Sequence, residues 1–136
     1  MTRFDADTPA ERRKLFAEAV TAHRTRGSAF LTVEVDADPD VDGTDDDDPL
    51  PGPWVQFSEK TFNLDVTDDE RARLEALLEQ FREFRIDELS SPEESEGTNV
   101  RITARSDANR LAAFVDHVFQ HVYDRDEDYR AWVTQI

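Results

Sequence analysis

The chain has 136 residues, with 32 Asp and Glu against 16 Lys and Arg, and a formal net charge of −16. It contains no cysteine, which excludes disulfide bonds and thiolate chemistry. The length suits one domain and is short for two, so we expect a single domain over residues 1–136. No stretch approaches the roughly 20 apolar residues of a membrane helix, and the first residues lack the apolar core of a signal peptide, so we expect a cytoplasmic location.

The net negative charge indicates which partners are unfavourable and which solvent suits the chain. A field of this sign repels nucleic acid and anionic lipid, so we expect no nucleic-acid partner and no membrane association. Only two of the basic residues are lysines, Lys14 and Lys60. Acid-rich, lysine-poor surfaces resemble those of extremely halophilic archaea, in which molar salt shortens the Debye length to about 3 Å and screens self-repulsion. We interpret the acidity as adaptation to molar salt rather than mimicry of an acidic partner.

The first helix is predicted between Thr8 and Gly27. Thr8 suits the N-cap, Pro9 suits the first helical position, and Gly27 is placed to end the helix. Residues 29–35 then alternate in polarity, which predicts a strand. The apolar stripe of the helix consists of Leu15, Phe16, Ala19 and Val20.

Residues 36–52 are rich in aspartate, proline and glycine, and predict a mobile acidic loop. Asp38, Asp40, Asp42 and Gly43 match the opening of an EF-hand calcium loop. The twelfth position, where a bidentate glutamate closes such a site, is Pro49, and the flanking segments predict strands rather than helices. We therefore expect loose counterion binding rather than a specific calcium site.

The central segment predicts two short strands and a helix. Residues 54–57 and 62–66 alternate in polarity on either side of a turn, which favours a hairpin. Thr67 and Glu70 fit a capping box at the start of the following helix. The helix has one apolar stripe, formed by Leu74, Leu77, Leu78 and Phe81.

The C-terminal third predicts a further strand and two helices. Residues 84–89 fit either a short strand or the frayed end of the preceding helix, whereas residues 99–105 alternate cleanly as a strand. A long helix capped by Ser106 or Asp107 follows, and residues 129–136 predict a last helix with Tyr129, Trp132, Val133 and Ile136 on one side. The apolar stripe of the long helix consists of Leu111, Phe114, Val115, Val118, Phe119 and Val122.

These elements follow one another in the order α-β-β-β-α-(β)-β-α-α. Strands joined by short turns pair antiparallel, so we expect an α+β fold of two layers, with a mainly antiparallel sheet and helices packed over one face.

No catalytic constellation stands out. There is no cysteine, no glycine-flanked serine, and four glycines are too few for a phosphate-binding loop. We expect a chain that is not an enzyme and that needs no cofactor.

His117, His121 and Asp124 form the one candidate metal set. Their spacing puts two imidazoles and a carboxylate on one helical stripe, which is a ligand set suited to zinc with an open position. The chain has no HExxH motif, and the two histidines also fit half-buried residues at the edge of the apolar face. We expect no metal, and we keep a metal-binding protein or metal-dependent enzyme as the alternative.

The outward face of the predicted sheet is the candidate partner-binding surface. Alternation places Trp54 and Gln56 on it, together with Arg101 and Arg105, near Phe30 and Thr32. Aromatic residues and arginine are enriched at protein interfaces. The alternative, which stays open at this point, is that the last helix packs on this face and brings Trp132 near Trp54.

The element order and several short motifs resemble the TY-Chap group, domains related to type III secretion chaperones. The matching pieces are residues 54–57 (WVQF), 111–114 (LAAF) and the aromatic segment 129–132. The resemblance implies an α-β-β-β-α-β-β-α fold, a role in binding other polypeptides and no catalytic residues.

We therefore expect a non-enzymatic, chaperone-like or adaptor domain that binds a protein partner or itself. A regulator with a small-ligand pocket between sheet and helices is a third hypothesis that the sequence leaves open.

Overall fold

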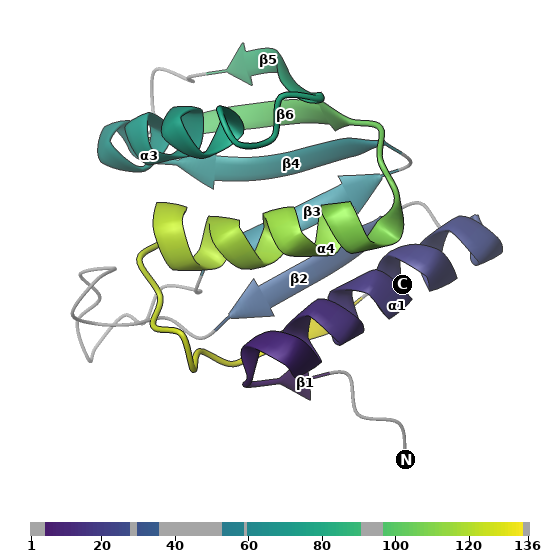
Figure 1. Ribbon diagram of the computed structural model, residues 1–136. Helices are drawn as coiled ribbons and strands as arrows, with labels where there is room; N and C mark the ends of the chain where they lie inside the picture. Colours follow the sequence, from purple (N-terminus) through teal and green to yellow (C-terminus); the bar gives the residue numbers. More distant parts are fainter. Residues whose placement is uncertain (1–4, 28–29, 36–52, 59, 91–96, 135–136) are drawn as a thin grey trace, which may run out of the picture.

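The computed structural model describes residues 5–27, 30–35, 53–58, 60–90 and 97–134. In these ranges, three helices and seven strands form an α+β fold, as predicted (Figure 1). The elements are β1 (Asp5–Ala6), α1 (Pro9–Arg26), β2 (Leu31–Val35), β3 (Trp54–Ser58), β4 (Thr61–Val66), α3 (Asp68–Leu78), β5 (Phe84–Ser90), β6 (Thr98–Ala104), α4 (Ala108–His117) with a π-helical turn (Val118–Val122), and β7 (Ala131–Thr134).

All seven strands belong to one sheet, in the order β1-β7-β2-β3-β4-β6-β5. Every neighbouring pair is antiparallel, as expected for strands joined by hairpins and by connections that return over one face. The hairpin at the centre joins β3 to β4, and Ser58 is paired with Thr61 at its tip. The predicted antiparallel sheet is therefore confirmed.

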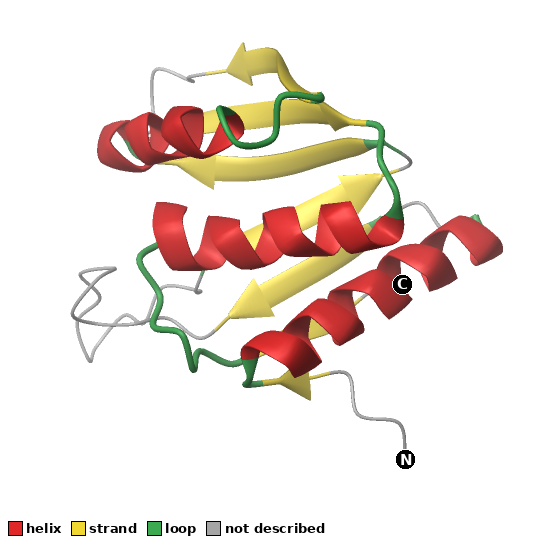
Figure 2. Cartoon of the chain, in the orientation of Figure 1, coloured by secondary structure: helices red, strands yellow, loops and turns green. Residues whose placement is uncertain are grey.

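The three helices lie on the same side of the sheet (Figures 1 and 2). Helices α1 and α4 pack side by side over its centre and lower half, and α3 packs against the π-helical turn. No element in the described part of the chain crosses the opposite face of the sheet. Within the described ranges, the sheet thus has one face buried by helices and one face without them.

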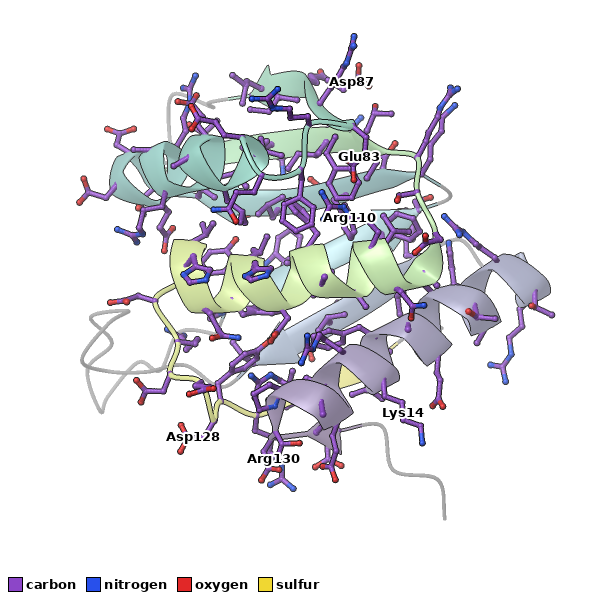
Figure 3. The ribbon with its side chains drawn as sticks, in the orientation of Figure 1. Lys14, Glu83, Asp87, Arg110, Asp128 and Arg130 are labelled. Atoms are coloured by element: carbon purple, nitrogen blue, oxygen red, sulfur yellow. The ribbon has the colours of Figure 1, made fainter. Side chains whose placement is uncertain are left out.

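Phenylalanine rings fill the layer between sheet and helices. Phe62 on β4 lies 4.8 Å from Phe57 and 5.2 Å from Phe114, measured between ring centroids. Phe81 in the turn before β5 and Phe84 at the start of β5 complete the cluster, and Arg110 covers the Phe81 ring at 4.0 Å. Arg110 also pairs with Glu83, which points toward it from the same turn (Figure 3). The connection between α3 and β5 is thereby tied to α4.

The predicted helix signals are present in the structure. Thr8 accepts a hydrogen bond from the Glu11 amide at the start of α1, and Gly27 ends that helix with φ of 63°. Thr67 and Glu70 form the reciprocal capping box of α3. Of the two candidates for the cap of α4, Asp107 accepts the bond from the Arg110 amide.

Residues 84–90 form a strand, not a frayed helix end, and β5 closes one edge of the sheet. At the other edge, Asp5 and Ala6 form a two-residue strand, β1, which pairs with β7.

The prediction of a last helix over residues 129–136 is wrong. Residues 131–134 form β7, which inserts between β1 and β2 in the sheet. Ala131 and Val133 point into the core, and Trp132 points to the other face, so the segment follows a period of two rather than a helical stripe. Pairing with β2 satisfies backbone groups that a terminal helix would leave at an open strand edge.

Candidate functional site

The helix-free sheet face gathers three of the four predicted partner-binding residues. Gln56 is opposite Asn63, and Asn63 is opposite Arg101, so Gln56, Asn63 and Arg101 lie in one row across β3, β4 and β6. Trp54 lies two residues from Gln56 on β3 and therefore shares its face. Arg105 follows the last residue of β6 and is exposed. We call this surface the open face.

Two tryptophans stand on the open face with an acidic residue between them. Glu34 on β2 is the cross-strand partner of Trp54 on one side and of Trp132 on the other. The indole N–H of Trp132 donates a 2.9 Å hydrogen bond to Glu34 Oε2. Both tryptophans are only partly buried. Trp132 thus comes near Trp54, but from β7, on the far side of β2 in the same sheet, and not from a helix that covers it.

A shallow polar hollow of about 300 Å³ lies on the same face. Phe30, which is 51% exposed, borders it just before β2. Amides, hydroxyls and one guanidinium group make up the remaining lining, contributed by Gln56, Ser58, Thr61, Asn63 and Arg101. These groups can donate and accept hydrogen bonds, and the ring supplies apolar area, so the hollow suits a polypeptide side chain.

The hydrogen bonds of Arg101 are not used up inside the chain. Its Nη1 lies 3.5 Å from Glu88 Oε2, and the two side chains are 56% and 63% exposed. An exposed ion pair of this kind contributes about 0–1 kcal/mol and exchanges readily with water. Arg101 is therefore free to change partner when another surface arrives.

The candidate metal residues do not come together as a set of three. The rings of His117 and His121 stack with 5.2 Å between centroids and 17° between planes. Asp124 follows the π-helical turn in a left-handed conformation, with φ of 57°. The described residues contain no group of three His, Asp or Glu side chains arranged to hold a metal ion.

His117 lies half-buried beside Phe81, with 5.9 Å between ring centroids. This burial, and next the neighbouring His121, lower the pKa of His117 below its ordinary value. The His117 imidazole therefore favours the neutral form near neutral pH. The π-helical turn that carries His121 is a rare local structure that the sequence pattern did not indicate.

A buried ionic cluster lies on the helix side of the sheet, and we call it the Arg12 cluster. Arg12 on α1 has no exposed surface, and its Nε donates to Asp116 Oδ1 on α4 at 2.9 Å. Its Nη atoms donate to the backbone carbonyls of Tyr129 and Glu127, at 2.8 and 2.6 Å. Asp116 also accepts from the Tyr129 hydroxyl at 2.9 Å and from Gln120 at 3.0 Å.

The Arg12 cluster is saturated. Both carboxylate oxygens of Asp116 and three guanidinium nitrogens of Arg12 have partners within the chain. Burial, followed by the adjacent Asp116, raises the pKa of Tyr129 above its ordinary value, so its hydroxyl stays protonated and donating. The cluster fastens the segment before β7 to α1 and α4.

Sequence reasoning did not identify this cluster, although one signal was present. Arg12 lies four residues before Phe16 and seven before Ala19, on the apolar stripe of α1. A charged residue in an apolar stripe indicates a buried pair. Its partner was out of reach, because Asp116 is 104 residues away along the chain.

A second hollow, of about 520 Å³, lies between α1 and the start of α4. Its lining combines three alanines with polar side chains, among them Glu18 and Arg26. We assign it no role.

The EF-hand-like aspartates of residues 36–52, and the expected mobility of that loop, lie outside the described residues. None of the helices in the described ranges is both long and apolar enough to cross a membrane.

No curated protein and no solved structure matches this sequence. One family does match, described as a family of unknown function (DUF7975), and the match runs over residues 1–136. Because the match spans the whole sequence, the chain belongs to the DUF7975 family.

Proposed function

We propose that this chain is a non-enzymatic, chaperone-like or adaptor domain that binds another polypeptide through the open face of its sheet. One observation carries the proposal. The face opposite the helices presents two partly exposed tryptophans, an exposed phenylalanine and a weakly paired arginine, and no described element covers it.

The composition of the open face supports a polypeptide partner. Tryptophan and arginine are the residues most enriched among those that contribute strongly to protein–protein binding. The hollow beside Phe30 offers amide and hydroxyl groups for main-chain and side-chain hydrogen bonds. The net charge of −16 disfavours nucleic acid and anionic membranes as partners.

The edge of the sheet is less suited to binding than its face. In β5, Asp87 has no cross-strand partner and forms a bulge between Ile86 and Glu88. Asp87 projects from this edge (Figure 3). Bulges and charges on an edge strand discourage pairing with another strand. We therefore place the partner on the face.

The absence of catalysis is part of the proposal, and the Arg12 cluster supports it. Arg12 and Asp116 are the buried ion pair, and their bonds are directed to each other and to neighbouring groups of the chain. They line neither of the hollows described above.

The proposed setting is a cytoplasm with molar salt. The twofold excess of acidic over basic residues supports this, since such a chain repels itself in dilute buffer. The resemblance to the TY-Chap group supports a polypeptide-binding role, and α1-β2-β3-β4-α3-β5-β6-α4 follows the element order that the resemblance implies. Strands β1 and β7 extend that order at either end.

Site-specific photo-crosslinking in cells tests the proposal. A photoreactive benzoylphenylalanine replaces Gln56 at the centre of the open face, and a matched control places it at the exposed Asp69 on α3. We expect discrete polypeptide adducts from position 56 that decrease when Trp54→Ala is added, and none of these from position 69. Absence of adducts at position 56, or the same adducts at both positions, would refute binding through this face.

The alternative is a metal-binding protein that uses His117 and His121. The stacked rings of half-buried His117 and exposed His121 favour it, because imidazole is a ligand for zinc, nickel and copper. Two ligands alone hold a metal weakly, and Asp124 does not complete a set of three with them. Titration calorimetry with zinc decides this: stoichiometric binding that is lost in His121→Ala would establish the alternative, and heat that is the same in both proteins would exclude it.

A further inference from the structure

The two halves of the open face differ in charge and chemistry. On β7, β2 and β3 lie Trp132, Glu34 and Trp54, which we call the tryptophan half. On the other side of the central hairpin lie four basic residues that we call the basic half. Arg85 on β5 and Arg101 on β6 lie on the face, and Lys60 in the hairpin turn and Arg105 just after β6 lie at its border.

The register places the basic residues close together. Arg85 is opposite Thr103, two residues from Arg101 on β6. The Ala104 amide donates to the Lys60 carbonyl at 2.7 Å, which brings the hairpin turn next to Arg105. Among the described residues, Lys60, Arg85 and Arg105 have no ion-pair partner.

Such a grouping is unusual in this chain, where acidic residues outnumber basic ones two to one. Other exposed basic residues of the described chain, such as Arg13 and Lys14 on α1, also have no ion pair, whereas Arg71 pairs with Glu75 and Arg130 with Asp5. The grouping of four basic residues, rather than the lack of ion pairs, therefore marks a surface that can receive carboxylates from a partner.

The tryptophan half supplies the complementary chemistry. Guanidinium groups stack on indole rings and bind carboxylates, and Glu34 keeps one oxygen beyond its bond to Trp132. Each half thus presents what the other half binds. Two copies of the chain can make both sets of contacts only when the basic half of each copy lies over the tryptophan half of the other.

A twofold axis does this if it lies in the interface between β3 and β4 and is tilted from the direction of the strands. The rotation exchanges the two sides of the hairpin, so that β6 of one copy lies over β2 of the other. Arg101 shares a row with Thr32, two residues from Glu34 on β2. The tilt brings each Arg101 over the partner's Glu34, which lies between Trp54 and Trp132. Every such contact occurs twice, as in any isologous dimer, and sheets pack in this manner with strands crossing at about 30°.

We propose that the polypeptide bound by the open face is a second copy of this chain, packed face to face with its basic half on the partner's tryptophan half. This inference rests on the proposed function and names its partner.

The size of the face sets the expected affinity. Seven strands about 4.8 Å apart and about 17 Å long give a footprint of roughly 500 Å². Stable dimers commonly bury about 800 Å² from each partner. The dimer is therefore weak, with a dissociation constant on the order of micromolar.

Sedimentation equilibrium of the purified chain tests this dimer, at about 0.5 M KCl, where the Debye length is about 4 Å. We expect twice the mass of one chain at high concentration, and at least about tenfold weaker association for Arg101→Glu or Glu34→Arg. The double variant exchanges the charges across both halves of the interface and recovers most of the affinity.

Two further variants guard against misleading outcomes. Arg82→Glu makes the same charge change on the loop after α3, away from the open face, and should associate like the wild type. Arg85→Glu, at another exposed position of the basic half, repeats the test if Glu34→Arg disturbs the fold.

A chain that stays monomeric at every concentration overturns the inference. So does a dimer that Arg101→Glu and Arg82→Glu weaken equally. Adducts from position 56 separate this failure from failure of the proposed function. If the purified chain is monomeric but position 56 still captures a polypeptide of different mass in cells, the face binds another protein. If no adduct forms, both proposals fail.

Discussion

Arg12 and Arg101 sit on opposite sides of the same sheet and differ in how completely they are paired. Arg12 is enclosed, donates three hydrogen bonds and lies 3.8 Å from the Tyr129 ring centroid. Arg101 is more than half exposed and has one ion pair at 3.5 Å. A charge that has been removed from water must be satisfied by its own chain, whereas an exposed one needs no internal partner. The first arginine is thus part of the fold, and the second remains available to a partner.

Removing Arg12 should cause the largest loss of stability, because Arg12 is the enclosed arginine of the two. Arg12→Ala leaves Asp116 buried without its counter-charge, and we expect the free energy of unfolding to fall by about 3–5 kcal/mol. Urea denaturation measures this. Arg13→Ala, at the neighbouring exposed position, is the control and should cost less than about 0.5 kcal/mol.

The double variant Arg12→Met with Asp116→Leu separates the loss of the ion pair from the cost of leaving one buried charge unpaired. It leaves no unpaired buried charge, so it should lose less stability than Arg12→Ala alone. If Arg12→Ala costs no more than Arg13→Ala, the cluster does not hold the C-terminal segment in place.

Trp54→Ala tests whether a tryptophan of the open face contributes to the core. Because Trp54 is only partly buried on the open face, its removal should lower the free energy of unfolding by less than about 2 kcal/mol. Phe62→Ala, at a fully enclosed position of the core, is the matched aromatic control and should cost about 3–5 kcal/mol. The measurement needs dilute protein, where association does not contribute. Equal losses would mean that Trp54 serves the core rather than a binding surface.

Salt should act strongly on the exposed charges and weakly on the buried pair of Arg12 and Asp116. Screening the net charge of −16 should raise the melting temperature by at least about 4 °C between dilute buffer and molar KCl, which corresponds to about 1 kcal/mol. The cost of Arg12→Ala should change little over the same range, because buried pairs are screened much less than exposed ones. A melting temperature independent of salt would contradict adaptation to molar salt.

His117 is half-buried, between the enclosed Arg12 and the exposed Arg101. Its protonation should have the smallest effect on stability of the changes considered. Burial lowers the pKa of His117 in the folded state, so the unfolded chain binds its proton more tightly. The contribution of neutral His117 to stability is therefore complete above about pH 6.5 and is lost as the pH falls below that value.

Removing the neighbouring charge tests this directly. His121→Gln should raise the pKa of His117, because His121 is the second cause of its depression after burial. An NMR titration of the His117 ring follows the change, with the buried His23 on α1 as an internal reference. A titration of His117 that is identical in the two proteins would show that the stacked arrangement does not persist in solution.

The sequence by itself determined the features that depend on near neighbours. The boundaries of α1 and the capping box of α3 follow from residues within four positions of each other, and the side chains act on the adjacent backbone. Alternation within β3 likewise decided that Trp54 and Gln56 share a face. Antiparallel pairing then followed from the short hairpin, so the fold class was predictable.

Only the tertiary structure decided the features that join distant parts of the chain. Residues 131–134 became a strand because β2, about a hundred residues earlier, offered an unpaired edge, and eight residues alone fit a helix or a strand. The same insertion brought Trp132 to Glu34, 98 residues away, and so created the tryptophan half of the open face. Arg12 and Asp116 met in the same way across α1 and α4. Pairing between strands and desolvation of charges act through space, so a local pattern shows which residues need partners without showing where those partners lie.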